Sequence, residues 1–259
     1  MMRNLIAVTF LLLIISNRNV HSQINIGVKA GLNMNDKLSK IEQTYNIPAT
    51  PAPTKTKLGY HFGVTISYEL SSSFSLNSGI LYVNKGSSLD LQEFYGRPES
   101  SWDTSTKKLE GHSRENYDYL ELPLQLSYKI WKGLRIYAGP YAAVGVSGRY
   151  NDDYTMYKNG KLDFEYKRNK SIKPIYTEKK LNVPTNDGGL HFRTELPREF
   201  NGIDYGVNSG IGYELGNFIL SSEYSLGLGN VKAKYTNVSR DIHRHRVLYF
   251  SLGYVLFKR

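Results

Sequence analysis

The sequence contains no cysteine, and proline accounts for only 9 of its 259 residues. Without cysteine the chain has no disulfide framework, no thiolate metal site and no N-terminal cysteine that could carry a lipid. Outside the cytoplasm, such a chain must be stabilised by packing or by its surroundings. Glycine and tyrosine are abundant, at 23 and 21 residues, which together with scarce proline indicates strands and tight turns. A hydrophobic content of 40% excludes general disorder.

Long apolar runs are also missing, apart from one near the N-terminus. There a basic "MMRN" precedes the apolar "LIAVTFLLLII", and the polar "NRNVHSQ" follows. Val20 and Ser22 fit the small-residue rule for cleavage before Gln23, so we expect residues 1–22 to be a signal peptide. The alternative, a membrane anchor, needs about 20 apolar residues, which this run lacks. Cleavage removes two arginines and no acid, so the mature chain, 23–259, has a net charge of 10 − 2 = +8.

What the mature chain has instead is alternation of apolar and polar side chains. In "YLELPLQLSYKI", residues 119–130, the apolar side chains recur every second position, which is the period of a strand with two unlike faces. Eight stretches show this pattern, each with at least the roughly 9–11 residues that a tilted strand needs to cross a bilayer. The predicted strands are 24–33, 58–70, 74–86, 117–130, 134–148, 203–215, 217–230 and 246–258.

The connections between these strands are alternately short and long. Tight turns are expected at 71–73, at 131–133 and at Gly216, and long polar connections at 34–57, 87–116, 149–202 and 231–245. An up-and-down barrel whose two ends face different compartments has this layout, with short periplasmic turns and long extracellular loops. An even number of strands also places both termini at the short-turn end.

Alternation alone fits two barrels of opposite sense. A soluble lipocalin-like barrel points its apolar face inward, whereas an outer-membrane barrel points it at lipid. The signal peptide and the unequal connections favour the membrane, and so do outward aromatic residues near both strand ends, as in the interfacial girdles of a bilayer. These aromatic residues are Tyr68, Phe74, Tyr128 and Phe218 near the turns, and Tyr60, Phe62, Tyr82 and Tyr205 near the long connections. The sequence therefore predicts an all-β, eight-stranded antiparallel transmembrane barrel in a bacterial outer membrane.

The same sorting assigns charged side chains to the lumen. A basic residue that faced lipid would cost roughly 2–4 kcal/mol near the midplane, so inward positions are favoured. Both signs occur, so we expect a hydrogen-bonded ion network along the barrel axis, and an eight-stranded interior is only wide enough for side chains. We therefore predict a plugged lumen and no open pore. The predicted lumen charges are Lys29, Glu69, Glu121, Lys129, Arg135, Glu214 and Glu223.

The long connections hold most of the surplus positive charge and many aromatic residues. Residues 231–246 carry 5 − 1 = +4 and residues 149–202 carry 11 − 8 = +3. Such loops suit the anionic sugar-phosphate layer of the outer leaflet, that is, lipopolysaccharide, although ordinary solvated loops are the plainer interpretation. Nucleic acid is not expected, because the basic residues show no arranged stacking aromatics. The candidate contact residues for a partner are Tyr154, Tyr157, Phe164, Tyr166 and Tyr176.

Five motifs in order resemble a known family. They are "GVKAGLN" (27–33), "YLELPLQLSYKI" (119–130), "GLRIYAGPYAAVGVSG" (133–148), "GIDYGVNSGIGYEL" (202–215) and "EYSLGLGNV" (223–231). As a set they resemble the outer-membrane β-barrel family that is widespread in Bacteroidetes and often labelled porin-family or PorT-like. The resemblance spans the mature chain and implies an eight-stranded barrel in the outer membrane of a Gram-negative bacterium. It does not imply an enzyme, and the PorT label implies a link to protein secretion.

No cofactor, metal or catalytic site is predicted. Asp241, His243 and His245 could together hold a transition metal, but Arg244 and Arg246 beside them would repel a cation. Serine and histidine are present, as a lipid hydrolase needs, but nothing in their spacing marks a triad.

We therefore expect a non-enzymatic outer-membrane barrel with long basic and aromatic loops. These loops would contact a partner protein or a surface glycan, as an accessory of an outer-membrane complex or secretion system. The alternatives are a small passive porin for solutes and, less favoured, a lipid-modifying enzyme.

Overall fold

The computed structural model describes residues 23–40, 53–95, 104–177, 199–232 and 242–259. The predicted signal peptide lies outside these described residues. Their one helix, α2 (Leu91–Tyr95), is short, and none in these ranges is long and apolar enough to span a membrane.

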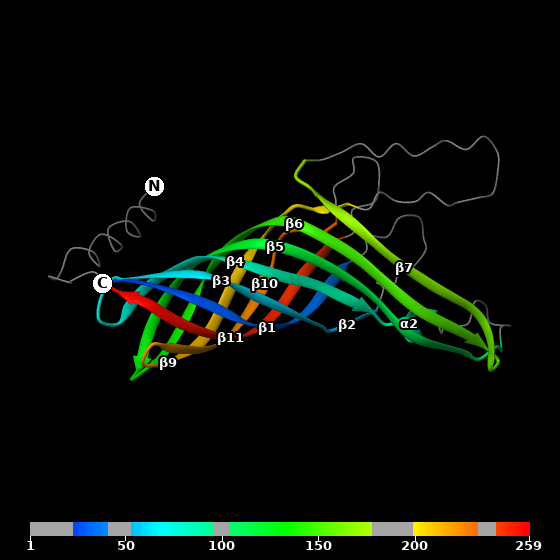
Figure 1. The fold of residues 1–259 in the computed structure, drawn as a ribbon, viewed down its shortest axis with the longest axis horizontal. Coiled ribbons are helices and arrows are strands. Elements are labelled where there is room, and N and C mark those ends of the chain that lie inside the picture. Colours follow the sequence, from blue (N-terminus) through cyan, green and yellow to red (C-terminus); the bar gives the residue numbers. More distant parts are fainter. Residues whose placement is uncertain (1–22, 41–52, 96–103, 178–198, 233–241) are drawn as a thin grey trace, which may run out of the picture.

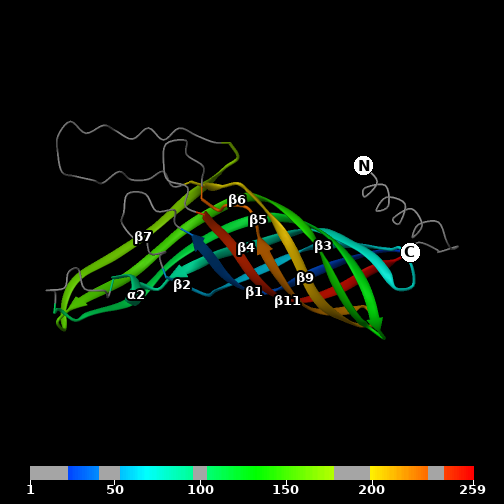
Figure 2. The same ribbon diagram turned by 180° about the vertical axis from the view of Figure 1, so that it is seen from behind.

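Eight antiparallel strands close into a barrel (Figures 1 and 2). Each pairs with two neighbours, and the ring is closed because β1 pairs with both β3 and β11. The predicted eight-stranded barrel is confirmed, and every predicted strand coincides with one of these elements. The barrel strands are β1 (Ile24–Lys40), β3 (Lys57–Glu69), β4 (Phe74–Leu89), β5 (Lys107–Trp131), β6 (Leu134–Lys158), β9 (Ile203–Leu215), β10 (Phe218–Gly227) and β11 (Ile242–Lys258).

Short turns join β3 to β4, β5 to β6 and β9 to β10 at one end of the barrel. Two of them contain a glycine with positive φ, Gly133 (76°) and Gly216 (64°), a conformation that L side chains rarely adopt. The start of the first barrel strand and the end of the last one also meet there, since the amide of Ile24 donates to the carbonyl of Arg259 at 2.9 Å. The barrel therefore begins and ends at its short-turn end, as predicted.

The barrel wall has an apolar outer face and a polar inner one. On β5, Leu122 and Leu124 are 52% and 45% exposed, whereas Glu121 and Gln125 on either side of them are 1% and 6% exposed. Aromatic rings gather outside near both ends, where Phe74 contacts Tyr128 and where Tyr60, Phe62 and Tyr82 stack on one another. The apolar face therefore points outward to lipid, as it does in a membrane barrel and not in a soluble one.

Above the barrel, β5 and β6 continue as a three-stranded sheet with β7 (Lys161–Ile175). Figure 1 shows this sheet projecting from the end of the barrel opposite the C-terminus. We call it the raised sheet: 107–116 of β5, 148–158 of β6, and β7. Two short strands flank it, β2 (Thr54–Lys55) on β4 and β8 (Glu199–Asn201) parallel to β7.

The raised sheet corrects the predicted extent of the long connections. Residues 149–158 and 161–175, expected to belong to one connection, are strand, because β6 keeps pairing with β5 and turns back into β7. Similarly, β1 runs on to Lys40, β4 to Leu89, and β5 and β11 begin earlier than predicted. The irregular parts are correspondingly shorter.

A β-bulge separates the two halves of β6. Tyr119 pairs with Gly145 and Asp118 with Ser147, so Val146 is an extra residue with no partner on β5. Below it, odd-numbered residues of β6 point inward; above it, even-numbered residues such as Tyr154 do. The bulge thus keeps buried side chains on the inner face while the alternation in the sequence changes phase.

The hairpin between β6 and β7 is built on Asn159 and Gly160. Their φ angles are 51° and 76°, and they lie between the paired residues Lys158 and Lys161. Positive φ at both central residues is what a two-residue type I′ turn requires, and Asn-Gly is its preferred sequence.

Candidate functional site

A buried ion cluster closes the lumen in its upper half, that is, the half nearer the raised sheet and farther from the short turns. The Nζ of Lys85 lies 2.7 Å from Glu121 Oε2 and 3.0 Å from Asp204 Oδ2, and all three residues are at most 2% exposed. The hydroxyl of Tyr141 donates to Asp204 at 3.1 Å, and the same ring lies under the Lys85 ammonium, 4.4 Å from its centroid. With the buried ring of Tyr119, these residues form what we call the lumen plug. Its charges are paired, as desolvated charges must be.

Two further ion clusters lie nearer the short turns. Lys29 Nζ is 3.1 Å from Glu223 Oε2, and the amide of Gln125 donates to Glu223 Oε1 at 3.0 Å. Arg135 lies between two acids, with Nε 2.6 Å from Glu214 and Nη2 3.4 Å from Glu69.

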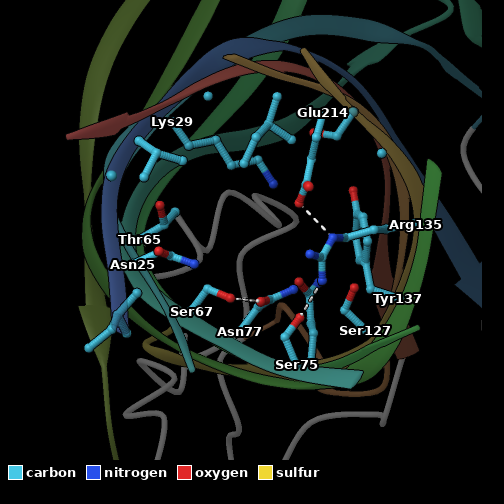
Figure 3. Close-up of a pocket in the computed structure, with 18 of the residues that line it drawn as sticks. Asn25, Lys29, Thr65, Ser67, Ser75, Asn77, Ser127, Arg135, Tyr137 and Glu214 are labelled. Carbon is cyan, nitrogen blue, oxygen red and sulfur yellow. Dashed lines mark hydrogen bonds and ion pairs between the residues drawn. The ribbon is translucent and has the colours of Figure 1, made fainter. Parts of the chain in front are cut away.

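A cavity of about 220 Å³ opens around Arg135 on the short-turn side. Figure 3 shows Arg135 reaching across it toward Glu214 and Ser75, and its Nη1 donates to the Ser75 hydroxyl at 3.0 Å. Among the described residues, the buried Ser127 Oγ in this lining has no hydrogen-bond partner. An orphaned polar atom beside free volume indicates ordered water. The lining does not reach Lys85 or Asp204, so the lumen plug separates this cavity from the extracellular end.

The structure therefore places the predicted lumen charges in three clusters. Lys129 is the exception: it is half-buried near a short turn and forms no ion pair with the residues that the structure describes, although its main-chain amide donates to Ser73. Lys85 and Asp204 were not predicted. The alternation along the strand could have revealed them. Asp204, for example, is an even-numbered residue of β9, like Glu214, which was predicted to face inward.

The inner face of the raised sheet forms the second site. Together with α2 and β2 it encloses a cleft of about 460 Å³, which we call the outer cleft. It is lined by Lys37, Thr54, Ser87, Leu89, Phe94, Tyr95, Ser113, Glu115, Tyr150, Asp152, Tyr154, Tyr166 and Arg168.

Aromatic rings form the floor of the outer cleft. Tyr154 is only 7% exposed, and its ring centroid lies 5.3 Å from that of Tyr166 and 5.7 Å from that of Tyr95. Its hydroxyl is 3.3 Å from that of Tyr95, and burial raises the pKa of the Tyr154 phenol. Of the rings in the lining, Phe94 and Tyr166 remain 44% and 36% exposed, so two ring surfaces are open to a ligand.

Paired charges stand beside these rings. The Nε of Arg168 donates to Asp152 Oδ2 at 2.6 Å, and its guanidinium lies 5.6 Å from the ring centroid of Tyr166. Lys37 Nζ is 2.6 Å from Glu115. Burial would raise the pKa of the Glu115 carboxyl, but the Lys37 ammonium outweighs it and holds that pKa below its usual value. The ion pair with Lys37 thus favours the carboxylate form of Glu115 at the margin of the cleft.

Of the candidate contact residues, Tyr154 and Tyr166 line the outer cleft and Phe164 packs edge-on against Tyr154. Tyr157 is half-buried at the hairpin end, and Tyr176 donates its hydroxyl to the Gly145 carbonyl at 2.6 Å; neither lines the cleft. The contributions of α2 and β1 were not predicted, because tertiary packing brings those segments to the raised sheet.

Histidine makes buried contacts in the upper barrel. His243 and His245 both point inward, and His245 lies between the rings of Tyr117 and Tyr119, 5.7 Å from each centroid. Asp241 lies outside the described residues. Within the described part of the chain, no group of three histidine or acidic side chains is arranged to hold a metal ion.

Comparison with known proteins identifies the family. The sequence matches the family described as "Outer membrane protein beta-barrel domain" over residues 16–233. The chain belongs to this family. The family and the barrel together place the protein in the bacterial outer membrane. The narrower assignment to Bacteroidetes PorT-like barrels remains a prediction, and no curated protein sequence gives a significant match.

Several solved structures are distantly similar. Ail of Yersinia pestis, in complex with the heparin analogue sucrose octasulfate, shares 10% identity over 91% of this chain and 99% of that chain, with a TM-score of 0.40. Neisserial surface protein A shares 10% identity over 88% and 96% of the two chains, with a TM-score of 0.39. OprG from Pseudomonas aeruginosa shares 10% over 91% and 97%, with a TM-score of 0.37.

Proposed function

We propose that this protein is a non-enzymatic outer-membrane barrel that binds a surface glycan in the outer cleft. The observation that carries the proposal is the lining of that cleft, in which aromatic rings alternate with hydroxyl, carboxylate and guanidinium groups. In this view the barrel is an anchor and the raised sheet is the binding element.

The size and chemistry of the outer cleft support a sugar ligand. A volume of about 460 Å³ lies in the usual range of small-molecule pockets, and a short oligosaccharide fits it. The apolar C–H face of a pyranose ring packs on the electron-rich face of an aromatic ring, and the exposed rings of Phe94 and Tyr166 in the lining provide such faces. Sugar hydroxyls would find acceptors in Asp152 and Glu115 and a donor in Arg168.

The closed lumen supports binding over transport. A solute entering from the short-turn side would meet the lumen plug, whose ammonium and carboxylates are desolvated and paired. We therefore expect no steady single-channel conductance in a planar bilayer, and a steady pore would contradict the plugged lumen.

The lipid-modifying enzyme is also disfavoured. The ring of His61 lies 2.8 Å from Ser251 Oγ and 3.4 Å from Asn33 Oδ1, an arrangement that resembles a hydrolytic triad. All three side chains, however, are buried inside the barrel, away from lipid, and line none of the cavities described above. This supports a structural role for the set.

The test is binding of bacterial surface glycans, presented on an array, to the full-length protein in detergent. We expect at least one glycan class to bind, with a loss of about tenfold or more in Tyr166→Ala and in Arg168→Gln, since each removes a direct contact. Tyr157→Ala, outside the outer cleft, is the matched control and should bind normally. Absence of binding to the whole array, or an equal loss in the control, would argue against the glycan.

A partner protein is the second candidate, favoured by the outer edge of β7. Among the described residues, this edge pairs only with β8 at 173–175, which leaves 161–172 open for another strand. The native size of endogenous protein in mild detergent decides between the two. Reproducible migration in a large assembly favours an accessory of a complex, whereas a bare monomer favours the glycan.

A further inference from the structure

Two arginines occupy an unusual position on the outside of the barrel. Along β11, His243, His245 and Val247 are buried in the interior, so Arg244 and Arg246 between them point outward. They lie directly above the lipid-facing series of β11 that begins at Leu248 and continues through Phe250 and Leu252. This is the level at which the apolar wall gives way to the polar part of the outer leaflet.

The two guanidinium groups have no counter-ion in the described part of the protein. The Nε atoms of Arg244 and Arg246 are inaccessible to solvent and make no hydrogen bond with the described residues. Asp36 stands opposite Arg246 on β1, but its Oδ1 accepts hydrogen bonds from the Lys37 amide and the Thr54 hydroxyl on the β2 side, and no ion pair joins it to Arg246.

The neighbours of the pair are mostly apolar. In the register, Arg244 stands opposite Leu38 on β1, and Arg246 stands opposite Leu226 on β10. The two side chains are half-buried, and the Nε of each is shielded from water without a partner among the described residues, so an anion supplied from outside would satisfy it. A planar guanidinium matches the oxygens of a phosphate in two parallel hydrogen bonds, and residues i and i+2 on one strand face stand about 6.8 Å apart, so both can reach one phosphate.

We propose that Arg244 and Arg246 bind the phosphate group of an outer-leaflet glycolipid. The leucines beside them contact the apolar part of the same molecule, and the site lies on the lipid-facing side of the barrel. A membrane lipid can contact both the arginines and the leucines, whereas a free phosphate ion can contact only the arginines. This site is separate from the outer cleft and does not depend on the proposed glycan binding.

The test measures binding of three probes to the full-length protein folded in detergent: diphosphoryl lipid A, the same lipid without phosphates, and inorganic phosphate. We expect the phosphorylated lipid to bind at least about tenfold more tightly than the dephosphorylated one, because charge-assisted hydrogen bonds are lost with the phosphates. In the double variant Arg244→Gln/Arg246→Gln this preference should vanish. The matched control, Lys108→Gln/Lys167→Gln, removes the same charge from the outer face of the raised sheet and should retain it.

Equal binding of the two lipids, or an unchanged preference in the arginine variant, would overturn the proposal. Competition by inorganic phosphate at concentrations equal to those of the lipid would assign the site to a free anion and not to a lipid. Heat-modifiable gel mobility shows whether the variant is folded. Should it not fold, native mass spectrometry of wild-type protein in mild detergent decides: phosphorylated glycolipid retained on the barrel supports the site, and its absence refutes it.

Discussion

The barrel wall and the raised sheet share two strands, β5 and β6, yet their polarities are opposite. In the wall, Leu124 of β5 faces outward and is 45% exposed; in the raised sheet, Tyr154 of β6 faces inward and is 7% exposed. The outer face of the raised sheet instead carries charged side chains such as Asp153 and Lys167, which pair at 3.0 Å. The difference follows from the surroundings, since lipid accepts apolar side chains and water accepts charged ones.

The interiors of the two regions also differ. The closed barrel excludes water around Lys85, so its ammonium needs the carboxylates of Glu121 and Asp204. The open raised sheet buries rings under α2 and leaves its charges at the margin of the outer cleft. Hence charge pairing stabilises the interior of the barrel, whereas aromatic packing stabilises the inner face of the raised sheet. Single substitutions can test this difference.

The largest effect is expected from Leu124→Arg, which places a charge in the lipid-facing wall. A cost of roughly 2–4 kcal/mol near the midplane should abolish outer-membrane assembly, measured by membrane fractionation and heat-modifiable gel mobility. Glu165→Arg, on the outer face of the raised sheet, should assemble normally, and so should Gln125→Ala in the lumen. If Leu124→Arg were tolerated as well as the other two, the orientation of the wall would be incorrect.

The next effect concerns the lumen plug. Lys85→Met leaves Glu121 and Asp204 buried without a cation, and we expect a loss of about 3–5 kcal/mol in the free energy of unfolding. Lys167→Met breaks an exposed pair on the raised sheet and should cost less than about 1 kcal/mol. Urea unfolding of both variants, followed by gel mobility, measures the difference. Similar losses would show that the plug is not desolvated.

Deletion of Val146 tests the bulge that lets one strand serve both regions. Without the extra residue, Ser147 follows Gly145 directly and still pairs with Asp118, so regular alternation keeps the even-numbered side chains of the upper half of β6 inward. We expect an assembled barrel in which Tyr154 stays protected from oxidative labelling and glycan binding is retained. A several-fold rise in the reactivity of Tyr154 would mean that the upper half of β6 pairs with β5 in a different register and that Val146 is not the extra residue.

The sequence predicted the barrel wall better than the raised sheet, because the wall is surrounded by lipid and the raised sheet by water. Lipid sorts side chains strictly, so alternation located all eight barrel strands. In β6 the alternation changes phase at Val146, and the residues beyond it resemble a polar connection. Asn159-Gly160 was the missed signal, since this dipeptide between alternating stretches is a strong indication of a hairpin. Lys85 and Asp204 could have been found from their inward positions in the alternation of their strands. The outer cleft, by contrast, depends on the packing of α2, which no local pattern encodes.

The smallest expected effect sharpens the comparison at the turns. Gly160 and Gly216 both have positive φ, at 76° and 64°, but the first closes the raised hairpin and the second a turn of the barrel wall. A non-glycine residue in this conformation costs about 1–2 kcal/mol. Gly160→Val should therefore increase hydrogen exchange in β7 and leave the barrel amides protected, whereas Gly216→Val should affect only the ends of β9 and β10. If Gly160→Val also loosened the wall, the raised sheet and the barrel would unfold as one cooperative unit, and the two regions could not be treated as energetically separate.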